Sequence, residues 1–339
     1  MTGRCGPSCK ISDITKFDRY RYIIERIYRI IDNMADTDSM IREALLERIE
    51  HKKKRLDHER PLPKDVLQRL HQEIRLAHTY HSDAIEGNTL SLQETQLILE
   101  DGITIGGRSI REHLEALGNA SAFDRIEVLA KGKKELDHVI IQEIHELVTK
   151  GQLTDSGRYR VHNVRITGAK FTPPDFSKVI PLMDDLLKEI RKMKGHKLTA
   201  ASYLHYRFVW IHPFSDGNGR VARLLMNLYL MSCGYPPTVL KKEDRRKYYN
   251  YLNKANDGDL GPFVNFIAKA VDESLSLYIS AFGGNDELMS LKELARGSPY
   301  SQEYLSLRAR QGILDAVKIG KTWHSTRSAM EAYLKGRKR

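Results

Sequence analysis

Apolar residues recur along this chain mainly at the spacing of an α-helix. The clearest run predicts a buried helix over residues 219 to about 232, with an apolar face of Val221, Leu224, Leu225, Leu228 and Met231. A second run predicts a helix over residues 64–85, with an apolar face of Val66, Leu67, Leu70, Ile74 and Ala77. Further helices are expected at 136–150, at 177–194, at 197–211 and in a segment ending near Phe282. The pattern therefore predicts a mainly α-helical protein, with one or two more charged helices over residues 13–60.

Capping residues mark several helix boundaries. Ser91 is followed three residues later by Glu94, which is the spacing of a capping box. Ser109 and Glu112 repeat that spacing. Gly87 follows the helix predicted over 64–85 and suits the left-handed conformation in which many helices end.

The segment 157–174 interrupts the helical pattern. Its residues from Gly157 to Gly168 show alternation and β-branched side chains, and Pro173 and Pro174 close it. Alternation bounded by such breakers is typical of β-strands. We therefore predict a short β-hairpin between two helices.

The chain changes character after residues 282–286, which we interpret as a linker. We expect a short helix opening at Ser290, a turn at 297–299, a second helix over 302–311, a hairpin over 316–324 and a last helix to about Lys335. Residues 290–339 contain 11 Lys and Arg against 4 Asp and Glu. Most of the net charge of +11 therefore lies in this segment.

Composition favours a soluble protein with a sizeable core, since the chain has 339 residues of which 41% are hydrophobic. No run of 18 apolar residues is present, and residues 1–10 lack the apolar stretch of a secretory signal. We therefore expect a cytoplasmic location and no membrane partner. Three cysteines exclude a disulfide scaffold, and they are too few for a four-thiolate zinc site within one chain.

The most informative segment is the turn before the helix at 219–232, residues 212–220 with the sequence HPFSDGNGR. Gly217 and Gly219 let backbone amides approach a ligand at the start of a helix, where negative charge is favoured. Arg220 and Arg223 lie one turn apart, so two guanidiniums on one face can bind successive phosphates. The segment predicts an anion site suited to a nucleotide.

Asp216 and His212 add reactive groups to this anion site. A carboxylate beside phosphates is a natural ligand for a divalent cation such as Mg²⁺ or Mn²⁺. His212 can take a proton from an incoming hydroxyl, because the ordinary pKa of histidine lies near neutrality. Each residue alone also fits a structural role, but together they follow the order that nucleophilic attack on a nucleotide phosphate requires.

Residues 212–223 match in full the motif H-x-F-x-D/E-G-N-G-R-x-x-R of the Fic family, and the chain resembles this family over roughly residues 62–280. The resemblance implies a Fic-fold helical domain that transfers AMP from ATP to a hydroxyl side chain of a target protein. It further implies His212 as general base, Asp216 as metal ligand and Phe214 as a core anchor. The implied nucleotide- and phosphate-binding residues in the motif are Asp216, Gly217, Asn218, Gly219, Arg220 and Arg223. No position departs from the motif, which argues against an inactive relative.

Residues 82–88, with the sequence SDAIEGN, resemble the inhibitory motif S/T-x-x-x-E-G/N of many Fic proteins. Ser82 and Glu86 fall one turn apart on the helix expected over about 64–87, and Gly87 follows them. In the family this glutamate pairs with the second arginine of the motif, here Arg223, and denies the terminal phosphate its partner. The resemblance therefore implies an autoinhibited enzyme.

The resemblance also assigns roles outside the motif. The hairpin over 157–174 resembles the flap that pairs with the target backbone and lines the nucleotide pocket, with Arg165, Ile166, Thr167 and Gly168 as the implied flap residues. Tyr248, Tyr249 and Asn256 lie where the family places residues around adenine and ribose. Plain helix packing is the alternative for the two tyrosines.

The helix, turn, helix and basic hairpin of residues 286–339 resemble the excisionase-type winged helix-turn-helix, a DNA-binding module. The resemblance implies that the helix bearing Arg308 and Arg310 enters the major groove and that Lys321 touches phosphate. A protein-docking module of the same shape is the alternative. A homodimer, common among relatives, is consistent with a reader of DNA half-sites.

These observations predict an N-terminal helical region (1–61), a Fic domain (62–282) and a winged helix-turn-helix-like domain (286–339). The favoured function is a self-restrained protein adenylyltransferase that uses ATP with Mg²⁺ or Mn²⁺ and modifies Ser, Thr or Tyr of a target, itself included. The alternatives are a nucleotide-sensing DNA-binding regulator with little turnover, a transferase of UMP, phosphocholine or phosphate, and an enzyme that removes AMP. Intact His212 and Asp216 favour the first, since a sensor could lose the base without penalty.

Overall fold

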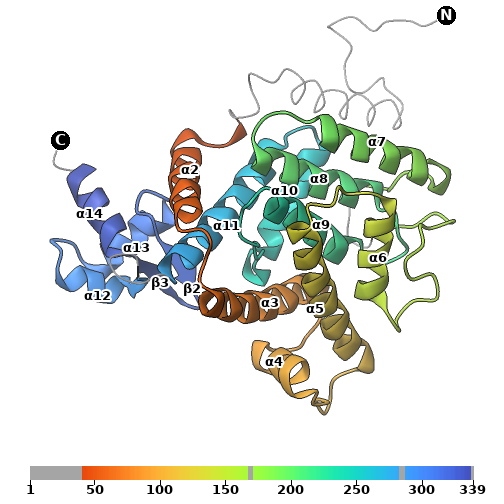
Figure 1. Ribbon diagram of the computed structural model, residues 1–339, viewed down its shortest axis with the longest axis horizontal. Helices are drawn as coiled ribbons and strands as arrows, with labels where there is room; N and C mark the ends of the chain where they lie inside the picture. The colour runs from red at the N-terminus through yellow and green to blue at the C-terminus, as the bar shows by residue number, and fades with distance from the viewer. Residues whose placement is uncertain (1–39, 167–170, 282–286, 337–339) are drawn as a thin grey trace, which may run out of the picture.

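The computed structural model describes residues 40–166, 171–281 and 287–336 (Figure 1). Helices of the larger body are α2 (Glu43–His58), α3 (Lys64–Glu86), α4 (Leu92–Asp101), α5 (Ile110–Lys131), α6 (His138–Thr149), α7 (Val179–Lys192), α8 (Lys197–Ile211), α9 (Asn218–Ser232), α10 (Arg245–Asn256) and α11 (Gly261–Ser280). The short 3₁₀ helices η3 (Phe176–Lys178) and η4 (Lys242–Asp244) precede α7 and α10. The mainly α-helical prediction is confirmed. The helices predicted at 64–85, 136–150, 177–194, 197–211 and 219–232 are also confirmed, with ends within two residues of those expected.

Helices α8 and α9 form the centre of the body and pack against each other (Figure 1). Both are buried over most of their surface, as expected for helices without a continuous polar face. Helices α5, α6 and α3 pack on α9, and α7 and α11 pack on α8. The loop between α8 and α9 is therefore held by two buried helices. Among the described residues, no helix combines the length and the apolar character needed to cross a membrane.

The predicted helix caps are confirmed. Ser91 and Ser109 each form a reciprocal capping box, with Glu94 and Glu112 respectively. Gly87 follows α3 at φ 109°, a left-handed conformation that a glycine adopts at little cost. Helix α3 therefore ends at Glu86, and its last turn faces the start of α9.

Helices α5 and α6 approach closely at Gly118 of α5. A methyl group at this position would lie 2.6 Å from the carbonyl oxygen of Leu147 and 2.9 Å from that of Val148. We expect Gly118→Ala to lower the free energy of unfolding by about 1–3 kcal/mol, because backbone atoms of α6 must move to admit the methyl group. Urea unfolding would measure the change. Gly132→Ala is the matched control, because its methyl group would make only ordinary contacts from 3.5 Å outward; equal stability of the two variants would contradict the prediction.

The C-terminal module is a small helical unit with its own sheet. Its elements are β1 (Met289–Ser290), α12 (Leu291–Arg296), α13 (Gln302–Arg310), β2 (Val317–Ile319), β3 (Thr322–Ser325) and α14 (Arg327–Gly336). The sheet is antiparallel in the order β1-β3-β2, and Leu291, Leu305, Leu314 and Met330 belong to a separate hydrophobic cluster. The predicted helices and hairpin are confirmed, whereas strand β1 was not anticipated. The predicted linker at 282–286 lies outside the described residues.

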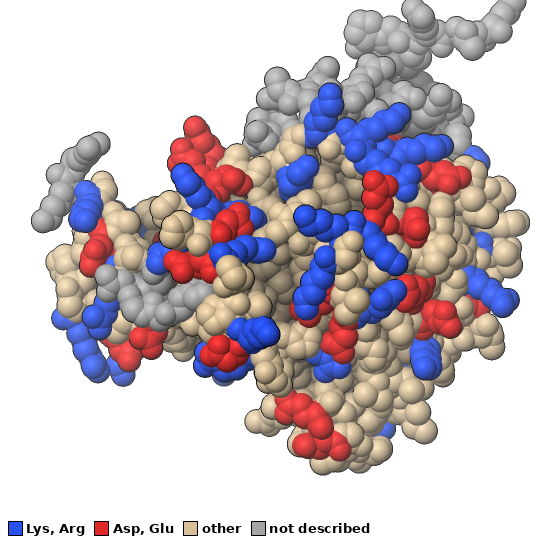
Figure 2. Space-filling view, viewed as in Figure 1, with Lys and Arg blue, Asp and Glu red and all other residues tan. Residues whose placement is uncertain are grey.

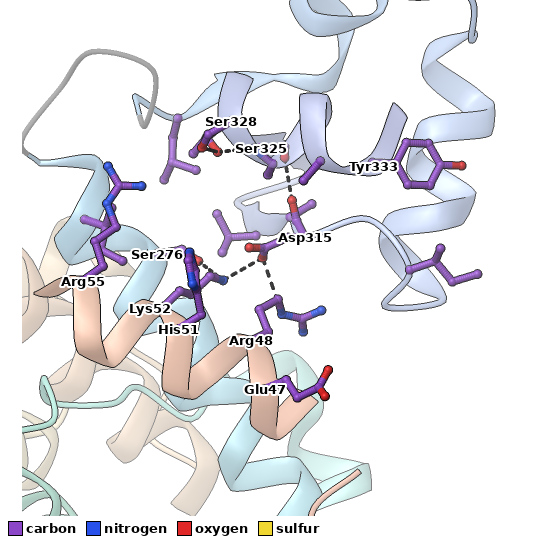
Figure 3. Close-up of a pocket in the computed structure, with 18 of the residues that line it drawn as sticks. Glu47, Arg48, His51, Lys52, Arg55, Ser276, Asp315, Ser325, Ser328 and Tyr333 are labelled. Atoms are coloured by element: carbon purple, nitrogen blue, oxygen red, sulfur yellow. Dashed lines mark hydrogen bonds and ion pairs between the residues drawn. The ribbon is translucent and has the colours of Figure 1, made fainter. Parts of the chain in front are cut away.

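The C-terminal module contacts α2 and α11 through partly buried charges (Figure 3). Lys52 of α2 is only 7% exposed, and its Nζ lies 2.7 Å from the carboxylates of both Asp272 and Asp315. Arg48 also binds Asp272 and donates to the carbonyl of Gly312 at 3.2 Å. These contacts border a cavity of about 660 Å³ between the module and the larger body. Two aspartates from different units therefore share the cations of α2.

Candidate active site

His212 is the first residue after α8 and has an uncommon backbone conformation, with φ 53° and ψ 59°. Its ring Nδ1 lies 3.2 Å from the carbonyl oxygen of Val209. We assign the ring proton to Nδ1, which donates to this carbonyl and leaves Nε2 as an acceptor. Burial lowers the pKa of His212 to about 4. The imidazole is therefore neutral at pH 7 and can accept a proton at Nε2.

Asp216 lies at the outer side of the same loop. Its Oδ1 accepts from the backbone N–H of Gly217 at 2.6 Å, and its Oδ2 lies 2.8 Å from Nη2 of Arg111. Arg111, in the first turn of α5, also binds Glu115 at 3.1 Å. The side chain of Asp216 remains 46% exposed. Arg111 was not anticipated from the sequence, because it lies 105 positions before Asp216.

Buried side chains fix the shape of the loop. Asn218 accepts from the backbone N–H of Phe214 and donates to its carbonyl, both at 2.9 Å. His145 of α6 stacks on the Phe214 ring at 3.6 Å, and its Nε2 lies 3.1 Å from the carbonyl oxygen of Asp216. Its Nδ1 accepts from Gly157, and burial lowers the pKa of His145 to about 4. The Asn218 side chain is thus used within the loop, and the supporting role of His145 was missed by sequence reasoning.

The start of α9 carries the residues predicted to bind an anion. Gly217 is the N-cap residue at φ 76°, and a methyl group there would lie 3.0 Å from the side chain of Thr149. Arg220 is 3% exposed, and its Nε and Nη1 have no hydrogen-bond partner among the described residues. Its nearest carboxylate oxygen, on Glu115, is 3.8 Å away. A buried guanidinium with unsatisfied donors beside a helix N-terminus is suited to an anion.

Glu86 reaches this site from the end of α3. Its Oε1 lies 2.8 Å from Nη2 of Arg223, and a methyl group at Gly219 would lie 2.2 Å from the same oxygen. Ser82 accepts from Nε of Arg223 at its hydroxyl and from Nη2 at its carbonyl, both at 2.9 Å. Burial is the largest single influence on the pKa of Arg223 and lowers it, but the Glu86 carboxylate together with Tyr248 and Tyr249 leaves the pKa raised. Donors of Arg223 are therefore occupied by α3, and the carboxylate lies against the first turn of α9.

Arg245 at the start of α10 also contacts the last turn of α3. Its Nε donates to the carbonyl of Ile85 at 2.7 Å, and its guanidinium lies 5.0 Å from the ring centre of Tyr249. This contact satisfies one of the carbonyls that a helix end leaves without a partner. Arg245 was missed by the sequence reading, since nothing local links it to α3.

The three residues expected around adenine and ribose lie in different environments. Tyr248 is 2% exposed; its hydroxyl lies 3.4 Å from Nη1 of Arg223 and 3.2 Å from Nε2 of His205. Tyr249 is half-buried and packs against Tyr248, and Asn256 is half-buried at the end of α10. The ring of Tyr248 therefore supports Arg223 from within the core.

The segment expected to form the flap differs from the prediction. Its described residues, 157–166 and 171–174, contain no β-strand, which corrects the hairpin expected there. The side chain of Arg160 binds the carbonyls of His162 and Pro174, at 3.0 and 2.6 Å, so these groups do not need a strand partner. Arg165 is exposed and Ile166 is half-buried. Thr167 and Gly168 lie outside the described residues.

The chain is similar in sequence to known proteins. The model of the Fic/DOC family matches residues 135–230. A protein of Aedes aegypti named "Protein adenylyltransferase Fic" is 36% identical over 295 residues, which cover 81% of this chain and 58% of that protein. A protein of the same name from Culex quinquefasciatus is 35% identical over 303 residues, which cover 83% of this chain and 60% of that protein. The chain thus spans about three fifths of the length of these curated relatives.

Solved structures share the fold over 70% of this chain. A Fic domain containing signaling protein from Bacteroides thetaiotaomicron has a TM-score of 0.64 and 30% identity, covering 70% of this chain and 97% of that one. Fic-1 from C. elegans has a TM-score of 0.62 and 36% identity, and the match covers 70% of this chain and 71% of that one. Together with the complete motif at 212–223, these similarities show that the chain belongs to the Fic family.

Proposed function

We propose that this protein is a protein adenylyltransferase, which transfers AMP from ATP to a Ser, Thr or Tyr hydroxyl of a target protein, itself included. The observation that carries the proposal is the neutral imidazole of His212 beside the anion site of α9, where the buried Arg220 has unsatisfied donors. The names of the relatives from Aedes aegypti and Culex quinquefasciatus favour AMP as the transferred group.

In the proposed reaction the hydroxyl oxygen of the target attacks the α-phosphorus of ATP. A new P–O bond forms, the bond from the α-phosphorus to the bridging oxygen breaks, and pyrophosphate leaves with that electron pair. His212 accepts the hydroxyl proton at Nε2. Arg220, Arg223 and the backbone amides at the start of α9 stabilise the negative charge of the phosphates.

Asp216 fits a magnesium or manganese ion. It offers one carboxylate, 46% exposed, next to the anion site, and the described residues contain no cluster of three His, Cys, Asp or Glu that could enclose a metal. Mg²⁺ typically binds one or two carboxylates together with phosphate oxygens and water. When bound, the ion supplies positive charge that offsets the charge of the phosphates. Arg111 is the group with which it would compete for Asp216.

Glu86 restrains the transfer in this proposal. Its carboxylate occupies a donor of Arg223 and lies against the first turn of α9, where a phosphate would bind. Arg223 donates two hydrogen bonds to Ser82, and Arg245 donates one to the carbonyl of Ile85; these three bonds hold the end of α3 in this position. A negative phosphate cannot approach Arg223 closely until this carboxylate moves, because like charges repel strongly at such short range.

The test compares nucleotides on the Glu86→Gly variant with magnesium. We expect label on the protein from ATP labelled at the α-phosphate and none from ATP labelled at the γ-phosphate. Transfer of the γ-label would indicate a phosphotransferase, and stronger labelling from UTP or CDP-choline would indicate another transferred group. Tight ATP binding without any transfer would favour the nucleotide sensor, and release of AMP from pre-modified protein would reveal the reverse reaction.

We further propose that residues 286–339 form a winged helix-turn-helix domain that binds DNA. Arg310 of α13 and Lys321 of the β2–β3 hairpin are exposed. Arg308 lies over the Tyr304 ring at 4.8 Å and donates to Gln311, so it is held near the same end of α13. Figure 2 shows acidic and basic side chains interspersed over much of the drawn face of the larger body.

Replacing both Arg310 and Lys321 by alanine is expected to weaken binding to duplex DNA. The slope of log K against log salt is negative, and each lost phosphate contact should make it shallower by about 0.9. The slope of the double variant should therefore be shallower than that of the parent by up to about 2. Fluorescence anisotropy over a salt series would measure the slope. Arg69→Ala with Lys188→Ala, which removes two charges from exposed sites on α3 and α7, is the control. Unchanged slopes, or no DNA binding by the parent protein, would favour the protein-docking alternative.

A further inference from the structure

Arg160 connects the catalytic loop with both ends of the flap segment. Its Nε donates to the carbonyl of His212 at 2.8 Å, and its Nη1 and Nη2 donate to the carbonyls of His162 and Pro174 at 3.0 and 2.6 Å. Its backbone N–H donates to the carbonyl of Pro213 at 2.9 Å. One side chain thus binds the residue after α8 and the two arms of segment 157–174.

The environment of Arg160 is unusual for a residue that serves stability alone. The residue is 3% exposed, and among the described residues it forms no ion pair with a carboxylate. Burial lowers the pKa of Arg160, and Asp175 only partly opposes this effect. Burying a cation without a paired anion is costly, so an apolar side chain would satisfy packing more easily. Because Arg160 instead binds the carbonyls of three residues around the catalytic loop, we infer that it shapes the candidate active site.

Arg160 binds the carbonyl of His212, a residue whose backbone has a sparsely populated conformation. Non-glycine residues rarely adopt a positive φ, and such conformations persist when the surroundings hold them. Arg160 binds the carbonyl of His212 on one side, while the ring Nδ1 of that histidine binds Val209 on the other. Both the backbone and the ring of His212 are therefore held in place.

The charge of Arg160 also affects His212. Burial is the main cause of the low pKa of His212; Arg160 lowers it further, while the carbonyl of Val209 and the carboxylates of Glu86 and Asp216 raise it. These are the charged groups that face the imidazole from α3, the α8–α9 loop and the flap segment. Loss of the cation at Arg160 should therefore raise the pKa of His212.

We propose that Arg160 is a positioning residue for AMP transfer, which aligns His212 with the flap arms that receive the target. The proposal rests on the proposed function. Because Arg160 touches none of the residues assigned to phosphate binding, changes at Arg160 should affect the transfer rate and leave ATP affinity nearly unchanged. Misplacement of a catalytic group by about 1 Å can cost about 100-fold in rate.

The test uses two substitutions in the Glu86→Gly protein, so that Glu86 is absent from every comparison. Arg160→Gln removes the charge, and Arg160→Lys keeps the charge but loses the planar donors. We expect both to lower the maximal self-labelling rate by about tenfold to 100-fold, with the half-saturating ATP concentration changed by less than about twofold. Arg158→Gln, an exposed arginine two residues earlier, is the control and should behave as the parent.

The pH profile separates the two effects of Arg160. The Glu86→Gly parent lacks a carboxylate that raises the pKa of His212, so its rate should fall only at a pH of about 4 or below, where His212 becomes protonated. Arg160→Gln should move this acidic limb to higher pH, whereas Arg160→Lys should leave it in place. Titration of the His212 ring by NMR should show the same difference without any need for activity.

The possible outcomes are distinct. Parent-like rates for both variants, or a loss confined to ATP affinity, would overturn the proposal. If Arg160→Gln fails to fold, the rate and ATP dependence of Arg160→Lys decide. If the Glu86→Gly parent transfers no AMP, the proposed function fails, and an unshifted His212 titration in Arg160→Gln would separately refute the link between the two residues.

Discussion

Replacing Glu86 by glycine is expected to raise self-modification with ATP and magnesium by about tenfold to 100-fold. The change removes the carboxylate that lies 2.8 Å from Nη2 of Arg223 and covers Gly219. A hydrogen bond between charged groups contributes about 1.5–3 kcal/mol, and each 1.4 kcal/mol corresponds to a factor of ten. Arg223 then has a donor free for the terminal phosphate. Transfer of label from ATP labelled at the α-phosphate would measure the change.

Two further variants make this result specific. Glu73→Gly changes an exposed glutamate of the same helix, so it should cost about 1 kcal/mol of stability and leave the labelling rate unchanged. Ser82→Ala removes one acceptor of Arg223 and should give a smaller activation than Glu86→Gly. Equal labelling by the parent protein and the Glu86→Gly protein would refute the inhibitory role of Glu86.

Adding His212→Ala to the Glu86→Gly protein is expected to reduce the labelling rate by about 100-fold to 10,000-fold. General base catalysis by a positioned side chain contributes about this much, and the neutral Nε2 of His212 is the acceptor that the loop provides. ATP affinity should change by less than about twofold, because His212 is not among the residues assigned to the phosphates. The measurement is the initial rate of label transfer at saturating ATP, with ATP binding followed separately.

A matched histidine variant controls for loss of an imidazole. His58→Ala removes a ring that is 88% exposed at the end of α2, and it should leave the rate of the Glu86→Gly protein unchanged. If the single and double variants at Glu86 and His212 label equally well, His212 is not the base. A proportional loss of ATP binding would instead show that His212 shapes the nucleotide site.

The local features of the candidate site could be predicted from the sequence. The motif at 212–223 is contiguous, and the turn and first helical turn that carry it follow from glycine and from the apolar period of α9. The capping boxes at Ser91 and Ser109 and the end of α3 at Gly87 are equally local. Backbone geometry alone relates residues three or four positions apart on a helix, so such features need no tertiary information.

The hairpin shows where local pattern was insufficient. Alternation of side chains in 157–174 favoured strands, but a strand exists only where its backbone groups have a partner strand. In the described residues of this segment, Arg160 binds two of the carbonyls instead. The sequence also gave no indication of β1, a strand of two residues that pairs with β3 near the end of the chain.

The sequence by itself determined the reactive loop of this protein, the helices that flank it and, through the resemblance, its family. Only the tertiary structure decided which distant groups surround that loop. Glu86 contacts Arg223, which lies 137 positions later in the sequence. His145 contacts the carbonyl of Asp216, 71 positions later, and Arg160 donates to the carbonyl of His212, 52 positions later. Such contacts depend on how α3, α6 and the flap segment pack around α8 and α9. That packing is set by the combined fit of many buried side chains, which no local spacing encodes.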